Sequence, residues 1–192
     1  MPRAAEHAPQ VEVRSRAELR RWLSDNHTTE TSVWLVTFKK HTDHYLNYGD
    51  LIEELLCWGW IDSQSRGVDA DRTSVRISPR NPNSAWSAAN KSKVEQARAV
   101  GAMTPAGEAL IAKAHTNGMW EFLDDVERLE VPDDLAEALG DLRQGWEAYP
   151  RSVKRGSLEW IKTAKTHSTR SKRIADIADN LERGLRPSLF RR

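Results

Sequence analysis

Apolar residues follow a helical spacing soon after the start of the chain. Leu19, Trp22 and Leu23 stand at i, i+3 and i+4, so they fall on one face of a helix. Ser15 and Glu18 form a capping box before this face, in which the serine side chain accepts a hydrogen bond from a free backbone N–H. The pattern therefore predicts a helix that begins just after Ser15.

Three later segments have the composition or the alternation of β-strands. They are residues 33–38, 60–67 and 73–78. Each is rich in β-branched and aromatic residues or alternates apolar with polar positions, and polar turn residues bound it. A turn at 68–72 lets the last two strands pair, so we expect the segments 58–66 and 76–90 to be neighbours in a small antiparallel or mixed sheet.

Helical patterns accompany these strands. Asp50 caps a helix that ends near Trp58, and Ser84 or Ser87 opens another that Gly101 closes. Further on, a Thr–Pro pair at 104–105 begins a helix, residues 119–131 are acidic and loop-like, and four helices are predicted between residues 132 and 184. The predicted fold class is α+β: a small antiparallel or mixed sheet with flanking helices, followed by a helical C-terminal bundle.

These elements divide the chain into five parts. We predict a disordered or extended N-terminus (1–14), an α+β core unit (15–118), an acidic connector (119–131), a helical C-terminal unit packed on the core (132–185) and a basic, frayed tail (186–192).

The charge is distributed unevenly, although the formal net charge is only +1. Residues 102–150 hold 3 basic and 11 acidic residues, and residues 151–192 hold 12 basic and 4 acidic residues. The preferred interpretation is that these two segments pack together and neutralise each other. Nucleic-acid binding through the basic helices is disfavoured, because the helix after Arg173 carries Asp176 and Asp179, which repel phosphate.

Several classes of protein do not fit the sequence. It has no apolar run long enough to cross a membrane, no signal-peptide core and a single cysteine, Cys57, so we expect a cytoplasmic protein without membrane insertion. Phosphate-loop, dinucleotide-binding, serine-hydrolase and zinc-helix motifs are absent. His41 and His44 alone rarely suffice for zinc. We therefore predict no metal site and no cofactor, and a buried structural Cys57.

Tryptophan is unusually frequent, with eight residues against three each of Phe and Tyr, and it marks the candidate site. Aromatic faces beside Arg and Asp edges can bind a planar or anionic small molecule. The candidate ligand-binding residues from the first part of the chain are Trp58, Trp60, Asp62, Arg66, Arg80, Trp86 and Asn90. Lys165 and Arg170 are candidates to close this site from the C-terminal unit. Alternatively, the three Trp residues belong to the core and Asp62 pairs with an arginine.

The motifs resemble those of the YdeI/OmpD-associated family, also described as bacteriocin-protection proteins. The resemblance rests on residues 56–62, 77–90, 94, 101–107, 160–165 and 169–170, and it covers roughly residues 15–184. Asn81 and Asn83 stand where the family often has arginine, which dilutes a basic loop. The family implies a bacterial cytoplasmic protein linked to tolerance of bacteriocins or cationic antimicrobial peptides, and it implies no established reaction or cofactor.

The leading hypothesis is thus a stress-protection protein that binds a small anionic or aromatic ligand, or a peptide, and this is favoured over an enzyme. One alternative is an enzyme of unknown reaction in which Asp62 is the general acid or base of a Trp-lined pocket. A second alternative is nucleic-acid binding through the basic C-terminal helices. The pattern does not determine the oligomeric state.

Overall fold

The computed structural model describes residues 8–191, and these form two compact units. The first unit ends at Glu121 and the second begins at Phe122. The expected disordered or extended N-terminus lies partly outside the described residues, and its described part includes a strand. No helix within residues 8–191 is both long and apolar enough to cross a membrane.

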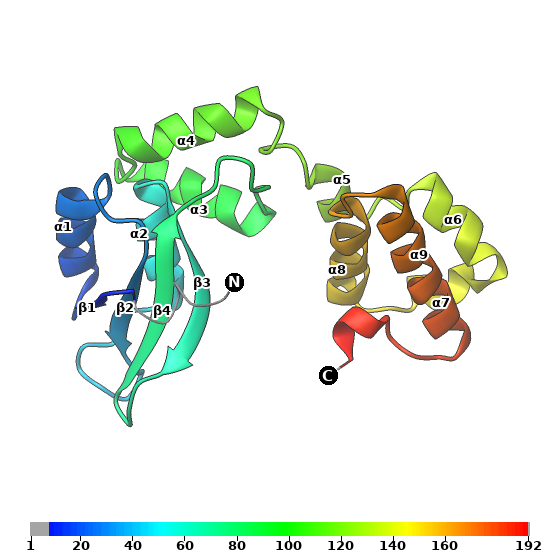
Figure 1. Ribbon diagram of the computed structural model, residues 1–192, viewed down its shortest axis with the longest axis horizontal. Helices are drawn as coiled ribbons and strands as arrows, with labels where there is room; N and C mark the ends of the chain where they lie inside the picture. The colour runs from blue at the N-terminus through cyan, green and yellow to red at the C-terminus, as the bar shows by residue number, and fades with distance from the viewer. Residues whose placement is uncertain (1–7, 192) are drawn as a thin grey trace. The chain divides into compact units, whose positions relative to one another are not determined.

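The first unit is a four-stranded mixed sheet with helices packed against it (Figure 1). Its elements are β1 (Gln10–Glu12), α1 (Arg16–Asn26), β2 (Val33–Phe38), α2 (Tyr48–Cys57), β3 (Trp60–Gly67), β4 (Arg72–Pro79), α3 (Ala88–Ala99) and α4 (Pro105–Thr116). The strand order is β1-β2-β4-β3, in which β1 runs parallel to β2 and the other neighbours are antiparallel. The predicted α+β fold with a mixed sheet is confirmed, and β1 is a strand that the pattern did not reveal.

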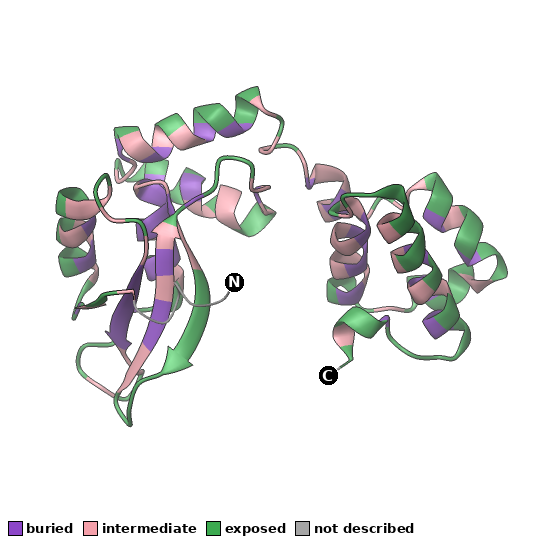
Figure 2. Cartoon of the chain, in the orientation of Figure 1, coloured by how far each residue is buried: buried purple, intermediate pink, exposed green. Residues whose placement is uncertain are grey.

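The register of the sheet places one row of apolar side chains towards the core. Val33 pairs with Ile77 and Leu35 pairs with Val75 across β2 and β4. All four are buried, together with Leu19 and Leu23 of α1 and Leu51, Leu55 and Leu56 of α2. Figure 2 shows the same distribution, with buried positions concentrated on β2 and the helix faces and exposed positions on β3. Burial of this aliphatic cluster is the main source of the first unit's stability.

Helix starts follow the expected capping chemistry at three places and depart from it at one. The side chains of Ser15, Ser87 and Thr104 accept hydrogen bonds from the backbone N–H three residues later. The expectation that Asp50 caps α2 is wrong, because Asn47 is the cap and its side chain accepts from the N–H of Gly49 at 2.7 Å. This earlier start brings Tyr48 into the first turn of α2.

The second unit is helical. Its elements are α5 (Asp124–Glu127), α6 (Asp133–Leu139), η1 (Gly140–Leu142), α7 (Arg143–Glu147), α8 (Arg151–Lys162), α9 (His167–Glu182) and η2 (Ser188–Phe190). Two segments are more ordered than expected, since α5 lies in the predicted acidic loop and η2 in the predicted frayed tail. The tail packs on the helices through Phe190, which lies against Gly156 of α8, where a Cβ would come within 2.6 Å of the ring.

Acidic and basic segments pair within the second unit. Lys162 of α8 donates to both carboxylate oxygens of Asp125 at 2.6 Å each, and Arg170 of α9 donates to Asp134 at 2.6 and 2.8 Å. Arg155 likewise contacts a carboxylate of the acidic segment. The interpretation that the two charged segments pack together is therefore confirmed for these residues.

Candidate functional site

Trp60 and Trp86 lie in the core. Each side chain is only 1% exposed to solvent. The ring of Trp60 meets Trp22 edge-on with centroids 5.7 Å apart, and its indole N–H donates to the carbonyl of His27 at 3.3 Å. The ring of Trp86 packs against Trp120 at 5.0 Å. In this arrangement neither ring presents a face to a ligand.

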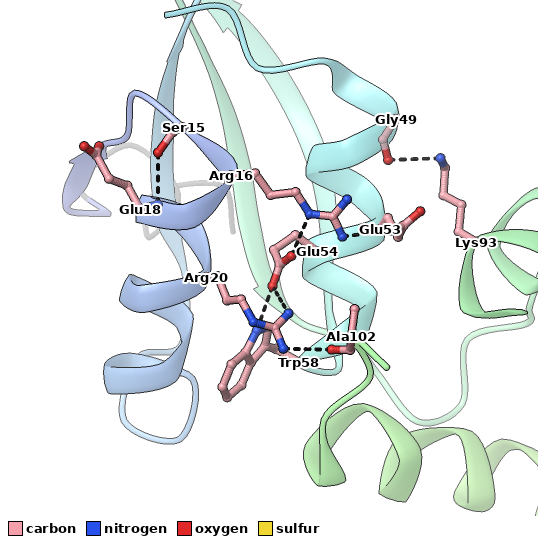
Figure 3. Close-up of polar contacts among 10 residues, drawn as sticks. All are labelled: Ser15, Arg16, Glu18, Arg20, Gly49, Glu53, Glu54, Trp58, Lys93 and Ala102. Atoms are coloured by element: carbon pink, nitrogen blue, oxygen red, sulfur yellow. Dashed lines mark hydrogen bonds and ion pairs between the residues drawn. The ribbon is translucent and has the colours of Figure 1, made fainter. Parts of the chain in front are cut away.

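Trp58 belongs to a polar cluster between α1 and α2 (Figure 3). The centre of this cluster is the carboxylate of Glu54, which is 1% exposed. It accepts from Arg16 Nε at 2.9 Å, Arg20 Nη1 at 2.7 Å and Trp58 Nε1 at 3.1 Å. Arg20 also donates to the carbonyl of Ala102 at 2.9 Å, which ties α1 to the segment before α4. The indole N–H of Trp58 is thus part of the hydrogen-bond network that joins α1 to α2.

Arg66, Arg80 and Asn90 each have their own partners. The guanidinium of Arg66 stacks on Trp34 at 3.8 Å, and that of Arg80 stacks on Trp86 at 4.3 Å. Asn90 lies in the first turn of α3, where its backbone N–H is capped by Ser87. The predicted pairing of the 58–66 and 76–90 segments is confirmed only for β3 and β4, so it does not gather these side chains into one pocket.

Lys165 and Arg170 belong to the second unit. Lys165 is exposed between α8 and α9, and Arg170 forms its paired hydrogen bonds with Asp134. The predicted site residues therefore occupy several separate places. Trp58 lines an open hollow beside Arg20 of α1, Arg170 lines a cavity within the second unit, and Asp62 lines the cavity described next.

Asp62 lies on β3, half-buried, where it accepts a hydrogen bond from the hydroxyl of Tyr48 at the start of α2. The register of β3 against β4 shifts between Asp62 and Ser65, which marks a β-bulge. Bulges redirect side chains and are frequent beside binding sites. The bulge therefore separates the row of Asp62 from the hydroxyl side chains further along β3.

A cavity of about 460 Å³ opens beside this bulge. Its lining residues come from β2, β3, β4, the 39–46 loop and the start of α2: Thr37, Phe38, Lys39, Lys40, Tyr45, Leu46, Tyr48, Leu51, Asp62, Ser63, Ser65, Thr73, Ser74 and Val75. We call it the sheet pocket. Ligand sites of this size are commonly apolar clefts with a few convergent polar groups, and this lining has that character.

The sheet pocket is polarised along the strands. Asp62 pairs with Ile77 on β4, whereas Thr37, next to Phe38 and the lysines, pairs with Thr73. Four residues of extended strand separate these two rows, a span of about 13 Å. One end of the pocket is therefore a carboxylate with a phenol, and the other end is lined by Lys39 and Lys40, of which Lys39 donates from Nζ to the carbonyl of Asp69 at 2.6 Å.

Sequence reasoning missed the aromatic wall of this pocket. Tyr45 and Tyr48 are 43% and 55% exposed, which is unusual for large side chains, and both line the cavity. The 41–48 segment has the composition of a polar loop, which does not predict a binding site. The available signal was two tyrosines three residues apart at a helix start, close to the end of a strand.

The chemistry of the titratable groups agrees with their surroundings. Burial, and then the hydrogen bond to Asp62, raise the pKa of Tyr48 to about 12, so its phenol is a neutral donor at physiological pH. Burial raises the pKa of Cys57 to about 11, which keeps the thiol protonated and unreactive. No cluster of three or more potential metal ligands exists within residues 8–191.

Comparisons with known proteins give two matches. A family described as a domain of unknown function, DUF8412, matches residues 11–110, which include the sheet pocket and the motifs around Trp58 and Trp86. A family described as "Bacteriocin-protection, YdeI or OmpD-Associated" matches residues 128–184, which lie within the second unit.

The second match confirms the resemblance to the YdeI/OmpD-associated proteins and assigns it to a shorter segment than residues 15–184. No curated protein and no solved structure matches the chain significantly. The first match spans more than half of the chain. The chain therefore belongs to the DUF8412 domain family and carries a C-terminal domain of the YdeI/OmpD-associated, bacteriocin-protection type.

Proposed function

We propose that this protein is a binding protein of bacteriocin-protection type, and that the sheet pocket of its first unit holds a small aromatic ligand with an anionic group. The observation that carries this proposal is the pocket itself: about 460 Å³ lined by exposed tyrosines, with opposite charges at its two ends. The protective role rests on the description of the family that matches the second unit.

The walls of the pocket suit a ring. Phe38, Tyr45 and Tyr48 offer aromatic faces, and Leu46 and Leu51 supply an aliphatic floor. Aromatic pairs gain about 0.5–1.5 kcal/mol beyond the burial of their area. The strand side chains add hydroxyl groups from Thr37, Ser63, Ser65, Thr73 and Ser74, which donate and accept hydrogen bonds. This combination favours a flat molecule with polar substituents over a purely aliphatic one.

The charges orient the ligand. A carboxylate or phosphate is attracted to the end with Lys39 and Lys40, and a hydrogen-bond donor is attracted to the carboxylate of Asp62. The span of about 13 Å between the two ends equals about four extended residues, so a dipeptide or tripeptide fits within it. A short zwitterionic peptide with an aromatic side chain provides the ring, the anionic group and the hydrogen-bond donor that these features favour.

The enzyme hypothesis assigns Asp62 a different role. A general base must reach the proton that it removes, and here the phenol of Tyr48 occupies the carboxylate as a donor. In the binding proposal the same pair is a recognition group that remains hydrogen-bonded. Asp62→Asn separates the two roles, because a binding protein keeps part of its affinity and an enzyme loses its turnover.

Titration with the dipeptide Gly-Phe, with its N-acetylated and C-amidated forms and with phenylacetate, tests the binding proposal by thermal shift and calorimetry. We expect saturable stabilisation by Gly-Phe, since a ligand of the folded state stabilises it by mass action. N-acetylation of the peptide should weaken its binding to the wild type but not to Asp62→Asn. Amidation should weaken its binding to the wild type but not to Lys39→Met/Lys40→Met.

Asp25→Asn on α1 is the charge-matched control for Asp62→Asn, and Lys113→Met on α4 controls for the loss of a lysine elsewhere on the first unit, because neither residue lines the pocket. The absence of saturable binding for all four probes would contradict the proposal. For the protective role, a bacteriocin-sensitive strain is transformed with the wild type or with Tyr48→Phe/Asp62→Asn. Survival that is equal for both would separate protection from the pocket.

A further inference from the structure

Arg80 is a buried cation without a carboxylate partner among residues 8–191. Only 7% of its surface is exposed, in the segment that follows β4. Nη2 makes its hydrogen bonds to described residues, to the carbonyl of Ala85 at 2.5 Å and to that of Ser84 at 3.5 Å. Nε is buried and has no acceptor. Burial lowers the pKa of this guanidinium, which is the direction expected for an uncompensated charge.

An unpaired buried charge calls for a physical explanation. Buried polar atoms are almost always hydrogen-bonded, and a buried ion normally has a counter-ion, because removing charge from water costs several kcal/mol per ion. The other buried ionic group of this unit follows that rule, since Glu54 accepts from two arginines and one indole. Arg80 has two carbonyls and the face of Trp86, which stabilise the cation but do not neutralise it.

We propose that Arg80 is an anion receptor, which binds the carboxylate or phosphate group of a small ligand beside Trp86. The orientation of the guanidinium is fixed, because its face lies 4.3 Å from the Trp86 ring and Nη2 donates to the carbonyl of Ala85, and Nε is left without an acceptor. A planar fork of this kind matches the oxygen atoms of a carboxylate or phosphate.

The neighbouring elements favour an anion as well. The residues that hold Arg80 lead directly into α3, whose N-cap is Ser87. The N-terminus of a helix carries a partial positive charge, and the first turn of α3 contains no acidic residue to offset it. Lys91 of the same helix lies 5.4 Å above Trp120, which in turn packs on Trp86. The N-terminus of α3 therefore adds its partial positive charge to that of Arg80 beside the aromatic pair.

This site is distinct from the sheet pocket. Arg80 does not line that cavity, and its backbone N–H bonds to the carbonyl of Gly59 at the opposite end of β3 from Gly67. The proposal therefore stands whether or not the sheet pocket binds Gly-Phe.

Inorganic phosphate and benzoate, each titrated at constant ionic strength against chloride, test the proposal on the full chain. The two probes distinguish a phosphate from a carboxylate source. Binding is followed by Trp fluorescence, because Trp86 touches the guanidinium, and by the ¹H–¹⁵N resonance of Arg80 Nε. We expect a saturable shift of this resonance in the wild type and a weakening of affinity by at least about tenfold in Arg80→Met.

Arg76→Met is the matched control, since Arg76 lies four residues earlier on β4 and donates to the hydroxyl of Ser32. Without anion, Arg80→Met should be as stable as the wild type or more stable, because it removes an uncompensated charge. A wild type that responds to neither probe, an unperturbed Arg80 Nε resonance, or equal affinity in Arg80→Met would overturn the proposal. If Arg80→Met does not fold, the wild-type resonance titration decides alone.

Discussion

The hydroxyl of Tyr48, in the first turn of α2, donates a hydrogen bond to the carboxylate of Asp62 on β3. The contact joins a helix start to a strand edge at one end of the sheet pocket, next to the bulge between Asp62 and Ser65. It also holds Asp62 as an acceptor that faces the cavity. The pair is therefore the point at which the architecture of the first unit meets its proposed ligand.

Tyr48→Phe is expected to change the dependence of stability on alkaline pH. The pKa of Tyr48 is raised to about 12 in the folded chain, from 10.0, so its contribution is complete below pH 10 and is lost as pH rises towards 12. The ring is more than half exposed, so the contribution is less than about 1 kcal/mol. Urea unfolding at pH 9 and pH 11 measures it, with Tyr45→Phe as the control. If the unfolding free energies of the wild type and Tyr48→Phe differed by the same amount at both pH values, the pH dependence of stability would not be due to the hydroxyl of Tyr48.

Glu54→Gln is expected to destabilise the first unit. The change weakens two hydrogen bonds to guanidinium groups and leaves Arg16 and Arg20 without their shared carboxylate. Hydrogen bonds to charged groups contribute more than neutral ones, so the free energy of unfolding should fall by about 2 kcal/mol. Urea denaturation provides the measurement, and the dependence of the unfolding free energy on urea concentration should keep its slope. Glu53→Gln is the matched control, since Glu53 bonds to Arg16 alone, and its effect should be about 1 kcal/mol or less.

The sequence predicted the skeleton of the fold well because that skeleton depends on local chemistry. The strands at 33–38 and 60–67 have the predicted bounds, since β-branched alternation and flanking turns act over a few residues. Caps such as Ser87 and Thr104 were readable for the same reason. The strand β1 was not predicted, because its three residues form a strand through pairing with β2, and no local sequence pattern encodes that pairing.

The candidate site was harder to predict, because a pocket depends on which side chains remain exposed. Trp60 and Trp86 each have charged residues close by in the sequence. Large aromatic rings near charges are as typical of a core as of a binding site. Only the register of β3 and the start of α2 at Tyr48 bring Asp62 to a cavity. Neither a bulge nor the shift of a cap from Asp50 to Asn47 can be read from residue types alone.

Gly107→Ala is expected to disrupt the contact of α4 with the end of α2. A Cβ at this position would lie 2.8 Å from the carbonyl oxygen of Leu56 and would also overlap the carbonyl of Cys57. These are backbone atoms that cannot move without shifting α2, so the free energy of unfolding should fall by about 2–3 kcal/mol. Thermal denaturation would reveal the loss. Gly67→Ala is the control, because a Cβ added at this position would meet no atom within 4 Å beyond its chain neighbours, and a comparable loss there would contradict the steric explanation.

Asp134→Asn is expected to remove an acid-sensitive contribution from the second unit. The hydrogen bonds from Arg170 lower the pKa of Asp134 below 3.8, so the ion pair stabilises the fold above this pH and its contribution is lost as pH falls through the lowered value. Because the pair is partly exposed, the variant should lose less than about 1 kcal/mol at pH 7. The difference between wild type and variant, measured by urea unfolding, should shrink as pH falls from 7 to about 2. Asp133→Asn, in the same turn of α6, controls for the helix dipole, and a difference that persists at low pH would show that Arg170 is not the cause.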